Sequence, residues 1–476
     1  MNSTRHLFLI AVLSLAAAGL SASAEQTKPN IIYIMADELA YFEPGFMGGK
    51  LLHTPNMDRL AASGVIMKNI LSGGPNCAPA RCALLTGKHS GHGSVRDNSS
   101  DNAIRADEKT IGDVLKPLGY AVGGFGKWGI GGRDSTGVPE KHGFDVFFGY
   151  YDQAHAHTYY PPYLIRNSEE VPLAGNKGGT RGQTYAQYPI HDAAMQFIRE
   201  QAGKKPFFAY LPYTPPHGPF AIPEADPAVA LYKDKPWGKE EKLYAAMVTM
   251  LDRQIGEVLD LLKQTGIEKN TLVFFSGDNG SQDRFATKEH PRGRFSGNKD
   301  PNGPTEFRGA KGAPYEGSVR VSFAVSWPGR IQPGRVSEHL GYFPDVLPTI
   351  AEVVGVEVPP GVDGVSFLPD LIGETAAGRR QAQHDYLYWE KGKWAAIRQG
   401  DWRAVSLGKS GWELYNVARD PAESKDLAKE SPDTLAKLIA LAKQAHEPQR
   451  AGTYTKRERA DRDRHPSGRG TKTTDE

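Results

Sequence analysis

The sequence predicts an α/β fold, in which a large mixed, mostly parallel sheet is covered by helices and followed by a smaller C-terminal subdomain with an antiparallel sheet and a helix. Three observations predict it. Short apolar runs end abruptly in polar residues, amphipathic segments lie between these runs, and after about Gly373 the pattern changes to short aromatic strands between charged turns. A chain of 476 residues is long enough for both units.

The N-terminus has the pattern of a secretory signal peptide. Arg5 and His6 precede an apolar stretch at 7–20, and Ala22-Ser23-Ala24 forms a small-residue cleavage site. We therefore expect residues 1–24 to be removed near Ala24 and the mature protein to be periplasmic or extracellular. No cysteine stands at the cleavage site to carry a lipid, and no later stretch is apolar enough to span a bilayer, so we expect no membrane anchor.

Four apolar runs are typical of central strands in a parallel sheet, because they are short and almost wholly apolar. The runs span 30–35, 120–125, 207–211 and 271–275, and the polar residues after them are Asp37, Glu38, Lys127, His217, Asp278 and Asn279. In open α/β sheets, ligands bind beyond the carboxyl ends of the strands, so we expect these side chains to converge there. The segment from Tyr244 to Lys263 carries one apolar stripe and is expected to be a covering helix.

The C-terminal part of the chain is expected to form a separate unit at 374–450. Short aromatic strands are predicted at 386–389, 394–398 and 402–405, and an amphipathic helix at 434–445. Residues 25–373 then make up the main domain. The stretch 451–476 mixes charges of both signs with few apolar residues, and we expect it to be disordered.

Composition excludes some classes of function. The formal net charge is +2 with both signs mixed along the chain, which argues against nucleic-acid binding as the main task. The only cysteines, Cys77 and Cys82, are five residues apart on one predicted helix and point to different faces, so they do not form a disulfide framework. Cys77 therefore remains available for other chemistry.

Cys77 opens the most informative segment of the chain. Pro79 suits the first turn of a helix, and Gly87 offers a place for that helix to end. Cys77 would then stand at the helix N-terminus, where free backbone N–H groups favour an anion. Arg81, one turn further on, adds a fork of donors. The pattern indicates a pocket for a tetrahedral oxyanion.

The acidic residues after two of the predicted strands are candidate metal ligands. Asp37, Glu38, Asp278 and Asn279 offer oxygen atoms, which suit a hard cation such as Ca²⁺ better than zinc. Acidic residues at strand ends also serve as helix caps, so the residues alone leave both roles open.

Several of these segments resemble those of the formylglycine-dependent sulfatase family, in the alkaline phosphatase-like superfamily. The run Cys77-Ala78-Pro79-Ala80-Arg81, followed by Leu85-Thr86-Gly87, resembles the sulfatase signature, whose cysteine is oxidised to formylglycine. The segments around Asp37-Glu38, Lys127, His217, Asp278-Asn279 and Lys311 are also similar to family motifs. The resemblance covers nearly the whole mature chain, and extends to bacterial carbohydrate sulfatases.

The resemblance implies an exported sulfuric ester hydrolase that acts on a sulfated saccharide, with residues 25–373 as its catalytic domain. The catalytic residues would be Cys77, Arg81, Lys127, His217 and Lys311, and one Ca²⁺ would be held by Asp37, Glu38, Asp278 and Asn279. It also implies a partner, the maturation enzyme that makes formylglycine from Cys77. Either His217 or Lys311 would protonate the leaving alcohol.

Two departures from the family pattern keep alternatives open. Glu38 stands where the second acid is usually Asp, and Gly129 stands where a histidine usually follows Lys-Trp. The identity of the base that releases sulfate is therefore open. A phosphonate or phosphodiester hydrolase of the same superfamily, or a non-catalytic sugar-binding relative, would fit the same residues.

A loop rich in aromatic residues at 149–163 is the candidate for substrate selection. Its His155 and His157, together with tyrosines, could stack on a sugar ring and bind its hydroxyls. Packing of the loop against the domain is the alternative, and the sequence does not decide between the two. A metal site at His155 and His157 is disfavoured because no third ligand is in view.

Overall fold

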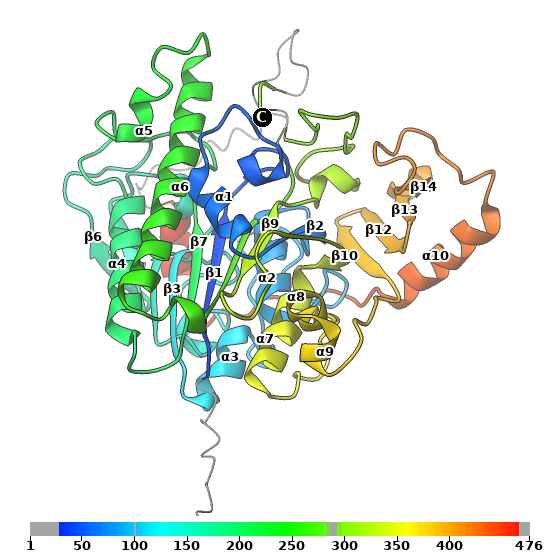
Figure 1. Ribbon diagram of the computed structural model, residues 1–476, viewed down its shortest axis with the longest axis horizontal. Helices are drawn as coiled ribbons and strands as arrows, with labels where there is room; N and C mark the ends of the chain where they lie inside the picture. The colour runs from blue at the N-terminus through cyan, green and yellow to red at the C-terminus, as the bar shows by residue number, and fades with distance from the viewer. Residues whose placement is uncertain (1–27, 100, 283–284, 286–292, 296, 466–476) are drawn as a thin grey trace, which may run out of the picture.

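The computed structural model describes residues 28–99, 101–282, 285, 293–295 and 297–465 (Figure 1). The expected signal peptide at 1–24 lies outside these residues. Within them, no helix combines the length and the apolar character that a membrane span requires.

The main domain is built on a ten-stranded sheet with the strand order β10-β2-β9-β8-β1-β7-β3-β4-β5-β6. The four expected central strands are present as β1 (Asn30–Ala36), β3 (Ala121–Lys127), β7 (Phe207–Tyr213) and β8 (Thr271–Gly277), and they are parallel neighbours. The other strands are β2 (Val65–Leu71), β4 (Val146–Tyr150), β5 (Tyr163–Arg166), β6 (Glu169–Pro172), β9 (Phe323–Ser326) and β10 (Arg335–Tyr342). Antiparallel pairing involves β5, β6 and β9, so the sheet is mixed and mostly parallel, as predicted.

Helices cover both faces of this sheet, and alternate residues of β1 point into the apolar core on one face or the other. Ile32 and Ile34 pack with α4 (Gln187–Gln201) and α6 (Lys239–Gln264), whereas Ile31 and Tyr33 face the core of α2 (Cys77–Thr86) and α7 (Val346–Val354) (Figure 1). The helix expected at Tyr244–Lys263 is part of α6. The remaining helices of this domain are α1 (Pro55–Ala62), α3 (Ile111–Leu115), α5 (Pro227–Ala230), α8 (Leu368–Ile372) and α9 (Glu374–Ala377).

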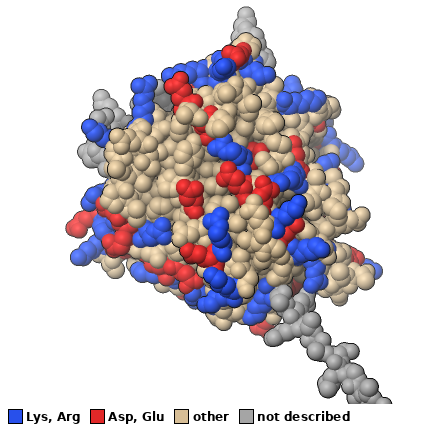
Figure 2. Space-filling model, turned by 60° about the vertical axis from the view of Figure 1, so that its left-hand side comes forward, with Lys and Arg blue, Asp and Glu red and all other residues tan. Residues whose placement is uncertain are grey.

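The surface over α4 and α6 carries both signs of charge. Lys and Arg are interspersed with Asp and Glu over the face drawn in Figure 2, as the balanced composition indicates.

The C-terminal unit is a four-stranded antiparallel sheet with a helix beside it (Figure 1). Its strands are β11 (Leu387–Lys391), β12 (Trp394–Gln399), β13 (Trp402–Ser406) and β14 (Trp412–Asn416), and the helix is α10 (Pro432–Gln444). Leu438 and Ala442 of α10 pack on Ile397 and Ala404 of the sheet. The predicted strands and helix are confirmed, and β14 is an addition.

The expectation of disorder from residue 451 is wrong for 451–465. Tyr454 pairs with Ser135 in a β-bridge, and residues Glu458–Arg464 form α11. Asp463, which is fully buried, accepts hydrogen bonds from Arg133 Nη2 at 2.6 Å and Nε at 2.7 Å, and from Tyr163 Oη at 3.0 Å. Ion pairs rather than an apolar stripe hold this segment against the main domain. Its charged composition therefore predicted disorder although the segment is folded. Residues 466–476 lie outside the described part.

We expect Asp463→Ala to lower the free energy of unfolding by about 2–4 kcal/mol, because it leaves the buried guanidinium of Arg133 with only Glu170 as an ionic partner. Chemical denaturation measures this loss. The control is Asp461→Ala on the same helix, since Asp461 is exposed and, in the described part of the chain, pairs with Arg457 alone. Its free energy of unfolding should change by no more than about 0.5 kcal/mol. Equal effects of the two variants would show that α11 is not docked in this way.

Candidate active site

The polar residues that follow the central strands converge at one edge of the sheet. Asp37 and Glu38 follow β1, Lys127 ends β3, and Asp278 and Asn279 follow β8. His217 lies beyond β7, between β1 and β3 in the strand order. Asp37, Lys127, Asp278 and Asn279 are fully buried, so this is an enclosed polar cluster rather than a solvated rim.

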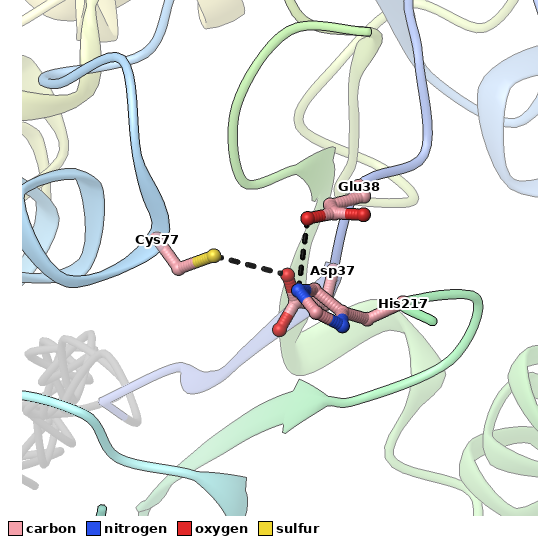
Figure 3. Close-up of side chains that lie close together, drawn as sticks. All are labelled: Asp37, Glu38, Cys77 and His217. Carbon is pink, nitrogen blue, oxygen red and sulfur yellow. Dashed lines mark hydrogen bonds and ion pairs between the residues drawn. The ribbon is translucent and has the colours of Figure 1, made fainter. Parts of the chain in front are cut away.

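Cys77 is the first residue of α2, as the sequence predicts. Asn76 precedes the helix in an extended conformation, and Gly87 ends it with a φ of 68°, which glycine adopts readily. The Sγ atom of Cys77 lies 3.3 Å from Asp37 Oδ1 (Figure 3) and 2.9 Å from Lys311 Nζ. The helix therefore presents Cys77 directly to the acidic residues after β1.

Arg81 and Lys127 neutralise the carboxylates. Arg81 Nη2 lies 3.2 Å from Asp37 Oδ2 and 3.1 Å from Asp278 Oδ2, and Lys127 Nζ lies 2.6 Å from Asp37 Oδ2. Burial alone would raise the pKa of Asp37, but the cations, Lys127 foremost, hold that pKa well below its usual range. Burial and the adjacent charge of Asp37 raise the pKa of Asp278.

The Cys77 thiol is not an activated nucleophile in this arrangement. Burial, and then the charge of Asp37, raises its pKa to about 12, although Lys127 and Lys311 act in the opposite direction. A thiol needs an electropositive, partly exposed setting to ionise near neutral pH. Cys77 is fully buried and stays protonated.

Glu38 links the two candidate acids. Its carboxylate contacts Lys311, and its Oε1 lies 2.8 Å from His217 Nε2 (Figure 3) and 2.9 Å from Gln282 Nε2. The backbone of Glu38 has a φ of 64°, and its N–H donates to Asp278 Oδ1 at 3.0 Å. Gln282 was not among the expected site residues, because it lies in no recognised motif.

The donor set fits a hard divalent cation. Asn279 donates from Nδ2 to the carbonyl of Gly280 at 3.0 Å, and its buried Oδ1 accepts no hydrogen bond from the described residues. Asp278 directly precedes Asn279 after β8, and Asp37 and Glu38 follow the neighbouring strand β1, where their carboxylates lie in one group with Cys77 and His217, so the site offers oxygens of the kind that Ca²⁺ binds. Each orphaned acceptor of this type is costly to bury without a partner.

The charges of the site support the same fit. Asp37, Glu38 and Asp278 carry three negative charges, and Arg81, Lys127 and Lys311 carry three positive ones. A bound dication would leave the pocket with a net positive charge, which favours an anionic ligand.

The two histidines of the aromatic loop have different positions. His157 ends the short helix η4 (His155–His157), and its ring stacks on that of His217 at 3.9 Å, with Nε2 3.5 Å from Lys127 Nζ. His155 is fully buried between Tyr150 and Tyr163, and its Nε2 is 3.0 Å from the carbonyl of Tyr163. His155 therefore packs within the loop, whereas His157 lies against residues of the polar cluster.

Gly129 has a structural reason to lack a side chain. Its φ is 77°, and a Cβ atom there would stand 1.9 Å from Nε2 of Gln153. Gln153 donates from that nitrogen to the carbonyl of Gly129 at 3.1 Å. The loop that carries His157 therefore also fills the space in front of position 129.

Comparison with known proteins gives the family. The sulfatase family model matches residues 29–356, and a model of the C-terminal region of N-sulphoglucosamine sulphohydrolase matches residues 310–449. The N-acetylgalactosamine-6-sulfatase of Canis lupus familiaris is 30% identical over 439 residues, which cover 86% of this chain and 78% of that protein. The endo-4-O-sulfatase of Bacteroides thetaiotaomicron is 29% identical over 416 residues, covering 76% and 77%.

Solved structures agree with this assignment. The crystal structure of Ps i-CgsB in complex with k-i-k-neocarrahexaose is 28% identical, with a TM-score of 0.74 over 88% of this chain and 92% of that one. The family match covers more than half of the chain and includes every residue of the polar cluster. The chain therefore belongs to the sulfatase family and is a sulfuric ester hydrolase.

Proposed function

We propose that this protein is an exported sulfatase that removes sulfate from a sulfated saccharide, through a formylglycine made from Cys77. The observation that carries the proposal is the position of Cys77, which begins α2 and faces Asp37, Lys311 and the cations of the cluster. The saccharide is supported by two relatives, one named for N-acetylgalactosamine and the other described in complex with a neocarrahexaose.

The chain's own cations would hold the sulfuryl group. Arg81, Lys127 and Lys311 lie around Cys77 and Asp37 in a site without bulk water, where fixed positive charges stabilise a developing negative charge strongly. Formylglycine, once made, supplies a hydrated aldehyde with one oxygen for attack on sulfur and a second hydroxyl for release of sulfate.

A proton must reach the leaving alcohol, and two groups are close enough to supply it. His217 Nε2 and Lys311 Nζ both contact Glu38, which orients them toward Cys77. A general acid of this kind contributes about 10²–10⁴-fold to the rate. Glu38 is therefore proposed both as a metal ligand and as the residue that positions the acid.

One Ca²⁺ is proposed at Asp37, Glu38, Asp278 and Asn279. When bound, it would polarise the reacting oxygen and add positive charge to the pocket. The unpaired Oδ1 of Asn279 supports this assignment, because a bound cation would give that buried oxygen a partner.

His157 is proposed to line the sulfate pocket next to His217 and Lys127. Its ring contacts His217 and lies next to Lys127, and burial foremost, with the proximity of these two residues, lowers its pKa well below the ordinary value. A neutral imidazole beside the sulfuryl group is able to accept a proton. This makes His157, rather than water, the candidate for the step that the family assigns to the missing histidine.

We expect protein produced together with a formylglycine-generating enzyme to carry an aldehyde at position 77 and a thiol at Cys82, as determined by peptide mass spectrometry. Cys77→Ala should abolish sulfate release, because it removes the nucleophile. Cys82→Ala is the matched control, since Cys82 lies on the same helix, is equally buried and makes no contact with the acidic residues. Fully active protein with an unmodified Cys77 would exclude the mechanism.

The substrate class is tested on the same preparations. Defined sulfated saccharides are compared with a matched pair of aryl sulfate and aryl phosphate esters, and free sulfate or phosphate is measured. Sulfate should be released from at least one saccharide faster than from the aryl sulfate, and the phosphate ester should react more slowly than its sulfate partner. The reverse order within the ester pair would favour a phosphorus substrate.

We expect Ca²⁺ to raise the midpoint of thermal unfolding of chelated protein, because a ligand at 100 times its Kd stabilises the folded state by about 2.7 kcal/mol. Asn279→Ala should remove most of this increase with little effect on the metal-free protein, where its Oδ1 has no partner. Asn298→Ala is the control, since Asn298 is another buried asparagine with an unpaired Oδ1 but lies outside the acidic group. An unchanged Ca²⁺ response in Asn279→Ala would contradict the ligand set.

We expect His157→Ala to lower kcat by about a hundredfold on both an aryl sulfate and a saccharide, because without the proposed base the release of sulfate slows, and this step is common to the two substrates. Its thermal stability should hardly change. His155→Ala should instead lower the free energy of unfolding by about 2–3 kcal/mol, through the lost packing and hydrogen bond, and leave kcat/KM of the folded protein unchanged. If His157→Ala affects only the saccharide, His157 is a specificity residue instead.

A further inference from the structure

The C-terminal sheet is held firmly against the catalytic domain. The buried carboxylate of Glu316, which lies shortly after Lys311 in the chain, pairs with Arg398 of β12 and Arg403 of β13 at 2.9 Å each. Trp389 of β11 donates from its indole N–H to the carbonyl of Ser72 at 2.7 Å. The tip of the β11–β12 hairpin is therefore fixed relative to the loops that carry the catalytic residues.

That hairpin tip reaches the rim of the active site. Lys391 and Trp394 pair across the tip, and the indole N–H of Trp394 donates to the carbonyl of Gly312 at 3.3 Å. Gly312 directly follows Lys311, and its own N–H donates to the carbonyl of Pro75, two residues before Cys77. The hairpin thus contacts the loops that position both Lys311 and Cys77.

The ammonium group of Lys391 lies over Gly312. Its Nζ is 3.2 Å from the position that a Cβ atom would take on Gly312, and Oδ1 of Asn76 is 3.6 Å from the same position. The absence of a side chain at Gly312 therefore leaves room between these two polar groups. Asn76 directly precedes Cys77, so the space adjoins the catalytic helix.

Both polar groups lack a protein partner. Within the described residues, Lys391 Nζ has neither an ion pair nor a hydrogen bond, and the buried Oδ1 of Asn76 accepts none. Burial, together with the nearby Lys311, lowers the pKa of Lys391, although Asp97 acts in the opposite direction. A half-buried cation without a partner is unfavourable in the free protein, and an anionic ligand would relieve that cost.

We propose that Lys391, Trp394 and Asn76 form a subsite for a sugar that carries a second anionic group, next to the sugar whose sulfate is removed. Lys391 pairs with the anionic group, the half-exposed indole of Trp394 packs on the ring, and Asn76 Oδ1 accepts a bond from a hydroxyl. The subsite rests on the proposed action on sulfated saccharides. It narrows the substrate class to saccharides with negative charges on neighbouring sugars.

The test compares ligands that differ in one charge. N-acetylgalactosamine 6-sulfate has one anionic group, a chondroitin-type disaccharide adds a carboxylate on the neighbouring sugar, and a disulfated carrageenan-type disaccharide adds a sulfate. Kd is measured by calorimetry on the full chain with Cys77→Ala, which removes turnover, and kcat/KM is measured on the matured protein. Lys391→Met should weaken binding of at least one disaccharide about tenfold and that of the monosaccharide less than twofold.

Two matched variants separate the charge from the fold. Lys391→Arg keeps the cation and should retain binding within about threefold, and Lys393→Met removes an exposed lysine from the same hairpin and should change nothing. The disaccharide that loses affinity identifies a carboxylate or a sulfate as the second group.

The outcomes distinguish the subsite from the function on which it rests. If both disaccharides bind the parent protein and Lys391→Met binds them equally well, the subsite is excluded while the sulfatase proposal stands. If Lys391→Met weakens the monosaccharide as strongly as the disaccharides, Lys391 acts on the reacting sugar and the subsite is also excluded. If the parent protein neither binds nor desulfates any of the saccharides, the proposed substrate class fails, and the subsite with it.

Discussion

The fold depends on burying Asp37, Arg81 and Lys127 together. None of the three has an exposed side chain, and an isolated charge in such a place would cost several kcal/mol. Each residue comes from a different element, namely the end of β1, the second turn of α2 and the end of β3. The strand order and the starting point of α2 are therefore constrained by one ionic cluster, and removing Asp37 would leave Lys127 without its ion pair and Arg81 with Asp278 alone.

The same cluster explains why this edge of the sheet suits an anionic substrate. Its three carboxylates and three cations balance, so the protein buries them without a large net charge. A bound dication would make the net charge of the site positive, which favours an anionic substrate. Glu316 has the corresponding role at the junction of the two sheets, where Arg398, Arg320 and Arg403, against the effect of burial, lower its pKa to about 2. One ionic cluster thus holds the polar edge of the main sheet together. The other fixes the hairpin beside it, together with the apolar cluster that joins Trp389 and Val405 to Leu71.

Sequence reasoning was successful where local chemistry decides the outcome. The central strands are continuous apolar runs, and the residues after them converge because parallel strands end at one edge, so Asp37, Lys127 and Asp278 could be grouped without a structure. Sequence reasoning failed where contacts between segments far apart in the chain determine the structure. The docking of α11 rests on Asp463 meeting Arg133, and no pattern within 451–465 reveals that partner. Lys391 was missed for the same reason, because only the docked C-terminal sheet brings it to Gly312.

The loop at 149–163 both fills the space in front of Gly129 and reaches the polar cluster. Gln153 fills the space in front of Gly129, and four residues later His157 reaches the ring of His217 and the ammonium of Lys127. A histidine at position 129 would need both a strained backbone and the removal of Gln153. The glycine and the loop are therefore one coupled feature: the loop keeps an imidazole beside the catalytic cations while its other histidine, His155, anchors it through the carbonyl of Tyr163.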